Sequence, residues 1–296
     1  MIKLRDLEYL TAIDEHKHFG HAAAACFVSQ PTLSGQLMKL EQQLGLQLVE
    51  RHRRNVMLTP AGTQLVKDAR KVLQAANEFE LSAKALLDPL AGDLHVGLIP
   101  TLAPYLLPHI MANLNNELSN INFFLYENQT NVLLKQLDQG KLDLLILPYL
   151  DSMDHFDSYQ LFDEPLMLAT PKDHPLNQLT SLSLADLNGQ KILTLEDGHC
   201  LKDQTMGYCF AAGANEDNSF EATSLETLRH MVASNMGITM LPELAVRDSL
   251  TSANIVYSHF QEPEPVRKIV LLIRPNYPRM ACVRVIVANI RASLSK

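Results

Sequence analysis

The chain has 296 residues, 47% of them hydrophobic, and no apolar run is long enough to span a membrane. This length predicts one small domain followed by a larger, two-lobed unit. The N-terminal stretch contains Asp6 and lacks the apolar segment of a signal peptide, so we expect a soluble cytoplasmic protein with no membrane partner. The net charge is −8, and residues 1–89 hold 11 Lys and Arg against 10 Asp and Glu. Binding to nucleic acid would therefore require local basic clusters.

Hydrophobic spacing predicts three helices in the first segment of the chain, over residues 4–16, 20–27 and 31–44. Ser29 or Gln30 lies at the entrance of the third helix, and Pro31 fits its first position. Two short strands are expected at 48–51 and 56–58, joined by the basic sequence RHRRN. A helix pair followed by a hairpin with a basic tip predicts a winged helix-turn-helix.

The outward face of the third helix is the expected DNA-reading surface. Gln30 or Gln36 is suited to adenine, Thr32 to a thymine methyl group and Ser34 to a phosphate. Four basic side chains are expected to neutralise phosphates: Lys39, Arg51, Arg53 and Arg54. Alone, the Arg pair would indicate only a solvated turn, but the elements before it favour DNA binding.

Residues 60–88 are predicted to form one long helix with an apolar heptad stripe. The stripe consists of Leu65, Ala69, Val72, Ala76, Phe79, Ala83 and Leu86. It could pack on its own domain, but dimerisation is favoured because the heptad is unbroken and the preceding domain is too small to cover it. The sequence DPLAG at 88–92 is expected to end the helix and act as a hinge.

From residue 93 the pattern alternates strand and helix, which predicts an α/β domain with a parallel sheet. The expected organisation is a DNA-binding domain at 1–59, a linker helix at 60–89 and a two-lobed regulatory domain at 93–296. Lobe I would contain residues 93–161 and 268–296, and lobe II residues 162–267, with a cleft between the lobes. The fold class is thus α+β in the small domain and α/β in the large one.

Four cysteines are present, at positions 26, 200, 209 and 282, without the spacing of a zinc finger. Cys200 follows His199 and precedes Lys202, and either basic group would favour the reactive thiolate. If residues 200–209 form one helix, the two Cα atoms lie about 13.5 Å apart, since each residue rises 1.5 Å. A disulfide requires less than about 7 Å, so bridging would force this segment to unwind.

Residue types alone leave other readings of these cysteines open. Buried structural thiols are the usual state of cysteine in a reducing compartment, and on residue types that reading is favoured. A metal site formed by His199, Cys200 and Cys209 has less support because no fourth ligand is evident. Cys26 and Cys282 are expected to serve packing, and no cofactor or metal is expected.

Several motifs resemble those of LysR-type transcriptional regulators. They are VSQPTLS at 28–34, LTPAG at 58–62, DHPL at 173–176 and GITMLP at 237–242. The family implies a winged helix-turn-helix, a coiled-coil linker helix and an effector domain like the periplasmic binding proteins. The match over the first sixty residues has no gap.

Other motifs resemble the peroxide-responsive members of that family. They are GLIPT at 97–101, PYLLP at 104–108, EDGHCLKDQTMGYCF at 196–210 and ATSLETLR at 222–229. The resemblance implies that Cys200 is the peroxidatic cysteine and Cys209 the resolving one. It also implies a peroxide pocket made by Thr101, Thr130, His199 and Arg267, with Asp203 assisting. Such groups can hold peroxide oxygens by hydrogen bonds and stabilise a thiolate.

The resulting expectation is a transcription regulator, not an enzyme, that assembles as a homotetramer on double-stranded promoter DNA of antioxidant defence. Hydrogen peroxide would be the effector, RNA polymerase a partner, and glutaredoxin or thioredoxin the reductant. Two alternatives remain at this point. One is a LysR-type regulator that binds a small organic effector in the cleft, and the other is a thiol peroxidase, which would leave residues 1–88 unexplained.

Overall fold

A computed structural model of the chain describes residues 1–51, 56–247 and 254–294. The chain divides into two compact units, Met1–Leu87 and Asp88–Lys296. The expected fold class is confirmed: a winged helix-turn-helix, one long helix and a two-lobed α/β domain. Within the described ranges, no helix combines the length and apolar character needed to cross a lipid bilayer.

The first unit begins with three helices and a hairpin. They are α1 (Leu4–His16), α2 (Phe19–Ala25), α3 (Gln30–Leu44), β1 (Val49–Arg51) and β2 (Val56–Leu58). Ser29 caps α3 by accepting a hydrogen bond from the Thr32 backbone N–H, with Pro31 in the first turn as predicted. The apolar faces of the three helices meet in one core, which includes Ile13, Leu33 and Leu37.

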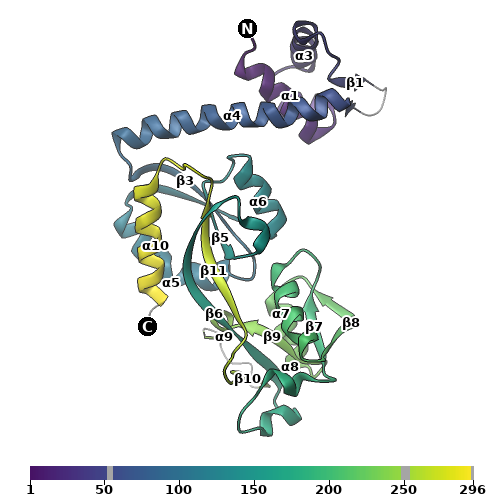
Figure 1. Ribbon diagram of the computed structural model, residues 1–296, viewed down its shortest axis with the longest axis vertical. Coiled ribbons are helices and arrows are strands. Elements are labelled where there is room, and N and C mark those ends of the chain that lie inside the picture. The colour runs from purple at the N-terminus through teal and green to yellow at the C-terminus, as the bar shows by residue number, and fades with distance from the viewer. Residues whose placement is uncertain (52–55, 248–253, 295–296) are drawn as a thin grey trace. The chain divides into compact units, whose positions relative to one another are not determined.

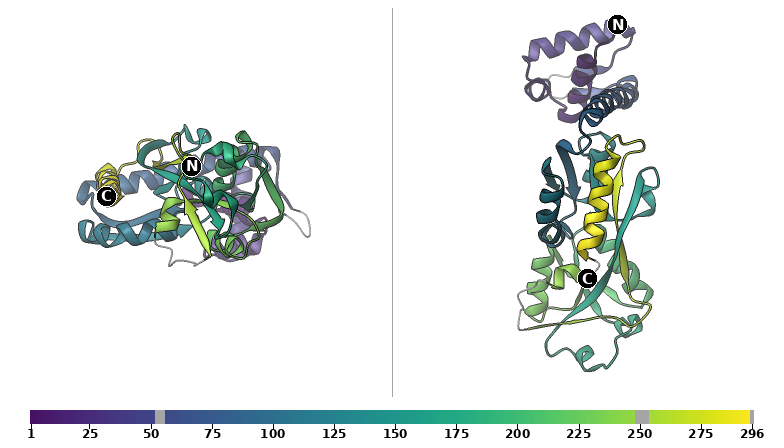
Figure 2. Two further views of the ribbon diagram at one scale, coloured as in Figure 1. Left: turned by 90° about the horizontal axis from the view of Figure 1, so that it is seen from below. Right: turned by 90° about the vertical axis from the view of Figure 1, so that its left-hand side faces the viewer.

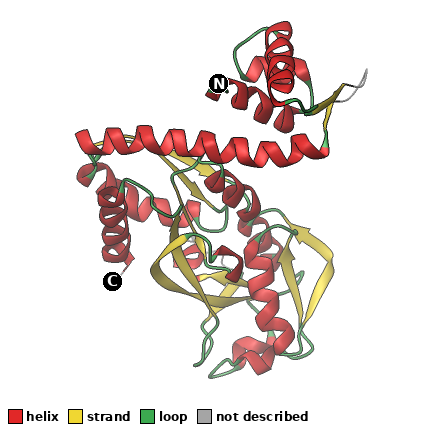
Figure 3. Ribbon diagram, turned by 45° about the horizontal axis from the view of Figure 1, so that its top comes forward, coloured by secondary structure: helices red, strands yellow, loops and turns green. Residues whose placement is uncertain are grey.

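α4 (Pro60–Leu87) is one continuous long helix (Figure 3). Its side chains are buried near its start and exposed farther along. Val66 and Ala69 are buried in the core of the first unit. Gly62 permits a close approach to the hairpin, because a Cβ there would lie 2.0 Å from the Leu48 carbonyl oxygen. Farther along, the heptad side chains face outward, and Phe79 and Leu86 are 76% and 88% exposed.

The second unit opens with a β-α-β-α-β segment. Its elements are β3 (Ala91–Leu98), α5 (Ala103–Glu117), β4 (Asn120–Glu127), α6 (Thr130–Asp138) and β5 (Leu144–Pro148). β3 lies between β4 and β5, and both pairs are parallel. The C-terminal helix α10 (Met280–Leu294) packs beside α5 (Figure 2). Parallel pairing places the ends of β3 and β4 at one edge of the sheet.

Two long strands continue this sheet (Figure 1). β6 (Asp157–Pro171) and β11 (Val266–Ile273) pair antiparallel, and β11 also pairs antiparallel with β5. The parallel sheet expected for the β-α-β-α-β segment is present, and the antiparallel strands β6 and β11 extend it into a mixed sheet. Alternating elements indicate the crossover between consecutive strands but do not show how a returning strand pairs. The predicted lobe boundaries at 162 and 267 lie inside these two continuous strands.

The remaining elements surround a hydrophobic core cluster of this unit. β9 (Thr239–Pro242) and β10 (Ile255–Ser258) pair with β6, while β7 (Lys191–Leu195) and β8 (Asn215–Ala222) form a separate parallel pair. The helices are α7 (Cys200–Ala211), α8 (Leu225–Ala233) and α9 (Glu243–Arg247). Leu201, Met206 and Cys209 of α7 belong to the cluster, so this helix is fixed by its apolar face.

Candidate functional site

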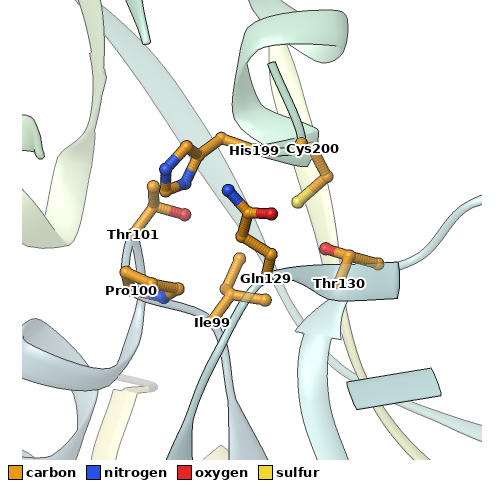
Figure 4. Close-up of a pocket in the computed structure, with 8 residues that line it drawn as sticks. Ile99, Pro100, Thr101, Gln129, Thr130, His199 and Cys200 are labelled. Carbon is orange, nitrogen blue, oxygen red and sulfur yellow. The ribbon is translucent and has the colours of Figure 1, made fainter. Parts of the chain in front are cut away.

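Three chain segments that are distant in sequence form a small pocket in the second unit (Figure 4). The first follows the carboxyl end of β3, the second follows that of β4, and the third leads into α7. Its lining residues are Ile99, Pro100, Thr101, Gln129, Thr130, Gly198, His199 and Cys200. Ligands of open α/β sheets commonly bind beyond the carboxyl ends of parallel strands, and a helix N-terminus favours negative charge. The pocket combines both features.

Cys200 is the first residue of α7 and is 6% exposed. The pKa of its thiol is raised overall, because the effect of burial exceeds the lowering by the Thr130 hydroxyl and the Arg267 charge. Figure 4 shows the sulfur of Cys200 and the hydroxyl of Thr130 directed toward one another. Thr130 Oγ1 is buried and has no nitrogen or oxygen partner among the described residues. A hydroxyl in this position can bind a further polar atom in the pocket.

Arg267 lies behind the pocket and is held on two sides. Its Nε donates to Glu164 Oε2 at 2.6 Å, within an ion pair whose side chains are both 1% exposed. Its terminal nitrogens donate to Thr101 Oγ1 at 3.1 Å and to the Thr101 carbonyl at 2.9 Å. Because Thr101 Oγ1 accepts from Arg267, its own hydrogen is free to point elsewhere. The other Glu164 oxygen accepts the backbone N–H of Leu244 at 3.2 Å.

The entrance to α7 depends on a glycine. Gly198 has φ +95°, and a Cβ there would lie 2.6 Å from Gln129 Oε1. Only glycine adopts this backbone conformation without strain and also leaves room for Gln129. The segment 198–200 is thereby pressed against the start of α6, which brings Cys200 to Thr130.

The structure brings together most of the residues expected at the pocket. Thr101, Thr130, His199 and Cys200 line it, and Arg267 contacts Thr101. Asp203 lies on the exposed side of α7 outside the lining, and its charge raises the pKa of Cys200.

Sequence reasoning missed Gln129 and Glu164. Gln129 lies two residues after a parallel strand and directly before a helix, so its position at the edge of the sheet was a usable signal. Glu164 gave no local signal, because its role depends on strand pairing with β11.

Lys202 does not serve Cys200 as the sequence suggested. Its ammonium group contacts Asp197 at 2.8 Å, Glu216 at 2.9 Å and Glu221 at 3.2 Å. The hydrogen bond with Asp197 is the main cause that raises the pKa of Lys202. The prediction that this ammonium acidifies Cys200 is therefore wrong. The side chain instead ties the start of α7 to β8 and to the loop before the helix.

Cys209 occupies the other end of α7 in an apolar setting. It is fully buried, with its sulfur 3.5 Å from Met240 Sδ, and burial raises its pKa to about 12. Both cysteines are free, and α7 is a continuous helix between them. An ideal helix separates residues nine apart by about 13.5 Å. The two thiols therefore cannot bond while α7 keeps this conformation.

The first unit presents the expected polar face of α3. Gln30, Pro31, Thr32 and Lys39 are exposed, and Ser34 and Gln36 are half-buried. The apolar face is buried in the core, so the polar face is the one available to DNA. Arg53, Arg54 and the side chain of Arg51 lie outside the described residues. The hairpin strands β1 and β2 that flank them pair antiparallel.

Two family models match the chain and together cover almost all of it. Residues 4–63 match the bacterial regulatory helix-turn-helix proteins of the lysR family. Residues 88–295 match the LysR substrate binding domain.

Individual relatives are similar over the whole chain. The DNA-binding transcriptional dual regulator OxyR of Escherichia coli is 49% identical over 293 residues, 99% of this chain and 96% of that protein. A full-length OxyR structure from Pseudomonas aeruginosa has a TM-score of 0.77 and 35% identity, covering 98% of each chain. Structures of the oxidized and reduced forms of OxyR each have a TM-score of 0.64, cover 70% of this chain and 98% of their own, and are 48% and 44% identical. The chain belongs to the LysR family of bacterial helix-turn-helix regulators, and within that family it is similar to OxyR.

Proposed function

We propose that this protein is a DNA-binding transcription regulator that senses hydrogen peroxide through reversible oxidation of Cys200 and Cys209. The observation that carries the proposal is the position of Cys200, at a helix N-terminus in a pocket with two threonine side chains, a histidine and a nearby arginine. The similarity to hydrogen peroxide-inducible gene activators supports the same effector. The thiol chemistry serves signalling rather than catalytic turnover.

The first step converts Cys200 to a sulfenic acid. The thiolate attacks one peroxide oxygen, an S–O bond forms, and the O–O bond breaks. The sulfur is oxidised, and the second oxygen leaves as hydroxide, which takes a proton and becomes water. Arg267 stabilises the thiolate, while the hydroxyls of Thr101 and Thr130 and the imidazole of His199 orient the peroxide oxygens.

The second step joins the two cysteines. The Cys209 sulfur attacks the Cys200 sulfur, an S–S bond forms, the S–O bond breaks, and the hydroxyl leaves as water. Because α7 separates the sulfurs, this step requires the helix to unwind. The disulfide thus selects a second conformation of the regulatory domain. A thiol donor such as glutaredoxin or thioredoxin would restore the reduced form.

The size of the pocket favours peroxide over an organic effector. Even all the empty space among the lining residues, including the part open to solvent, is only about 150 Å³. Pockets for drug-sized ligands have roughly 300–1,000 Å³. A thiol peroxidase is also disfavoured, since residues 4–63 match a helix-turn-helix family.

The DNA-binding part of the proposal rests on α3 and α4. The exposed face of α3 enters the major groove, where Gln30, Thr32 and Gln36 contact base edges and Ser34 and Lys39 contact phosphates. Arg51, Arg53 and Arg54 are assigned to the phosphates of the wing. The exposed side chains of the α4 stripe pair with a second copy, and two such dimers form a tetramer. RNA polymerase is the expected partner at the promoter.

A cysteine series tests the proposal. DNA fragments are first selected from a random-sequence library by the full-length wild-type chain, and footprints are compared before and after addition of peroxide. We expect a changed footprint and a Cys200–Cys209 disulfide in peptide maps for the wild type and for Cys282→Ser, whose thiol is also buried. Cys200→Ser should give neither. A peroxide-dependent footprint in Cys200→Ser would refute the assignment.

A further inference from the structure

One hydrogen-bonded contact joins α7 to β11 and is not used by the peroxide pocket. Tyr208 lies on α7, one residue before Cys209, and its hydroxyl donates to the Val266 carbonyl at 3.0 Å. The Val266 N–H donates back to the same hydroxyl at 3.4 Å. The ring is half-buried and packs against the core cluster that contains Cys209. A single side chain thus occupies both backbone groups of one strand residue.

Strand pairing explains why Val266 has these groups available. Leu166 N–H donates to the carbonyl of Pro265, the residue before β11, so positions 166 and 265 are hydrogen-bonded. At the adjacent position, opposite Pro165, Val266 must then point its N–H and C=O away from β6. On that edge of β11 the pairing with β5 starts only at Ile269. The Tyr208 hydroxyl therefore takes the place of a missing strand.

A disulfide between Cys200 and Cys209 that moves Cys209 would break this contact. Closing the gap from about 13.5 Å to less than about 7 Å requires unwinding within residues 200–209. Tyr208 is adjacent to Cys209, so its hydroxyl cannot keep the distance to Val266 when Cys209 moves. The N–H and C=O of Val266 then lose their partner beside Arg267.

We propose that Tyr208 is a positioning residue that holds α7 helical by binding the uncovered edge of β11, and thereby opposes disulfide formation. This inference rests on the proposed function, because it presumes the Cys200–Cys209 disulfide. The first oxidation step does not involve Tyr208, since Arg267 remains held by Glu164 and Thr101. The hydroxyl therefore sets how readily the sulfenic acid, once formed, becomes a disulfide.

The test compares full-length Tyr208→Phe with the wild type in glutathione redox buffers. The measurement follows the equilibrium in which the protein dithiol and oxidised glutathione react to give the protein disulfide and two molecules of reduced glutathione. We expect the constant for oxidation to rise about tenfold in Tyr208→Phe, equivalent to a potential about 30 mV more negative. Tyr257→Phe is the matched control, because the buried Tyr257 hydroxyl has no hydrogen-bond partner in the described structure. Its potential should equal that of the wild type.

Two further measurements separate this role from general loosening of the fold. In a Cys209→Ser background, Tyr208→Phe should change the rate of Cys200 oxidation by less than about twofold, because the pocket is intact. Hydrogen exchange at the Val266 amide should be slow in the reduced wild type and fast in both the oxidised wild type and reduced Tyr208→Phe.

The outcomes distinguish the two proposals. A wild-type disulfide with an unchanged or less negative potential in Tyr208→Phe would overturn the role of Tyr208 and leave peroxide sensing intact. A shift of the potential in Tyr257→Phe equal to that in Tyr208→Phe would also overturn the role of Tyr208 and leave peroxide sensing intact. A wild type that forms no Cys200–Cys209 disulfide would overturn both.

Discussion

The two ends of α7 place the same side chain in opposite surroundings. At the N-terminal end, Cys200 adjoins a pocket with Thr130 and the charge of Arg267, and both lower its pKa against the effect of burial. At the C-terminal end, Cys209 lies among apolar side chains beside Met240, and burial alone raises its pKa to about 12. Cys200 thus has neighbouring groups that stabilise its thiolate, whereas burial is the one cause that shifts the pKa of Cys209.

This difference assigns an order to the chemistry. A thiol reacts as its thiolate. In the helical state only Cys200 of the pair has neighbouring groups that lower its pKa, although burial still raises that pKa overall. Under the proposed function, Cys209 would react only after it leaves the core, so disulfide formation would depend on a change of conformation.

The largest expected effect is in the relative reactivity of the thiols. In the native, reduced chain, iodoacetamide should modify Cys200 about a hundredfold faster than Cys209. Burial raises the pKa of both thiols, but only the Cys200 thiolate has a hydroxyl and a guanidinium that stabilise it, while the pKa of Cys209 rises to about 12. Mass spectrometry of peptides over time measures the rates. In urea the two cysteines should react at similar rates, which controls for intrinsic chemistry. Equal rates in the native chain would remove the contrast between the two ends of the helix.

Loss of the arginine should produce the next largest effect. We expect Arg267→Met to slow oxidation of Cys200 by about a hundredfold at neutral pH, as for loss of a preorganised donor at a reacting charge. The rate is measured in a Cys209→Ser background by trapping the sulfenic acid.

The variant also leaves Glu164 buried without its ion-pair partner, which costs about 3–5 kcal/mol of folding stability. Arg274→Met is therefore the control, because Arg274 is equally buried but hydrogen-bonds the carbonyls of Leu137 and Leu142. A similar loss of rate in both variants would attribute the effect to general destabilisation.

The sequence predicted those parts of the site that depend on local order. Thr101 and Thr130 follow predicted strands, and His199 and Cys200 are adjacent in one motif, so their convergence follows from a sheet with both strand ends at one edge. The charge environment could not be predicted in this way. Lys202 is within one turn of Cys200 in sequence, but side chains at that spacing leave the helix in different directions. The carboxylates that bind Lys202 come partly from β8, a strand without a recognisable sequence signal.

The fold shows the same division between local and non-local information. The three helices of the first unit and the heptad stripe of α4 were predicted from periodicity, which is a local property. The antiparallel pairing of β6 with β11 joins residues about a hundred positions apart and was not predicted. Glu164 and Tyr208 both act through β11, so neither could be assigned a role before that pairing was known.

A smaller change is expected from the threonine that faces Cys200. Thr130→Val keeps the shape of the side chain and removes a hydroxyl that lowers the pKa of Cys200. The pKa should rise, so the pH profile of the oxidation rate should move to higher pH, because only the thiolate reacts. A shift of one pKa unit reduces the rate at neutral pH about tenfold. Val132→Thr, at a half-buried position of the same helix, should leave the profile in place. An unshifted profile in Thr130→Val would exclude an effect of this hydroxyl on the thiol.

The smallest effect on reactivity is expected from Lys202→Gln. The ammonium is bound by carboxylates rather than by Cys200, so the oxidation rate should change by less than about twofold. The stability of the fold should respond instead. The pKa of Glu216 is lowered from its ordinary value of 4.5, chiefly by its hydrogen bond with Lys202. Its contribution to stability is therefore present above pH 4.5 and is lost as the pH falls through the lowered pKa.

Lys202→Gln should accordingly reduce the loss of stability that the wild type shows on acidification below pH 4.5. Urea unfolding at pH 7 and pH 4 measures this difference. Lys191→Gln, in an exposed position at the start of β7, is the control and should behave as the wild type. If Lys202→Gln instead slowed oxidation of Cys200 tenfold with unchanged acid stability, the ammonium would act on the thiol. The difference between the two ends of α7 would then depend partly on the charge of Lys202, although its described partners are carboxylates that do not line the pocket.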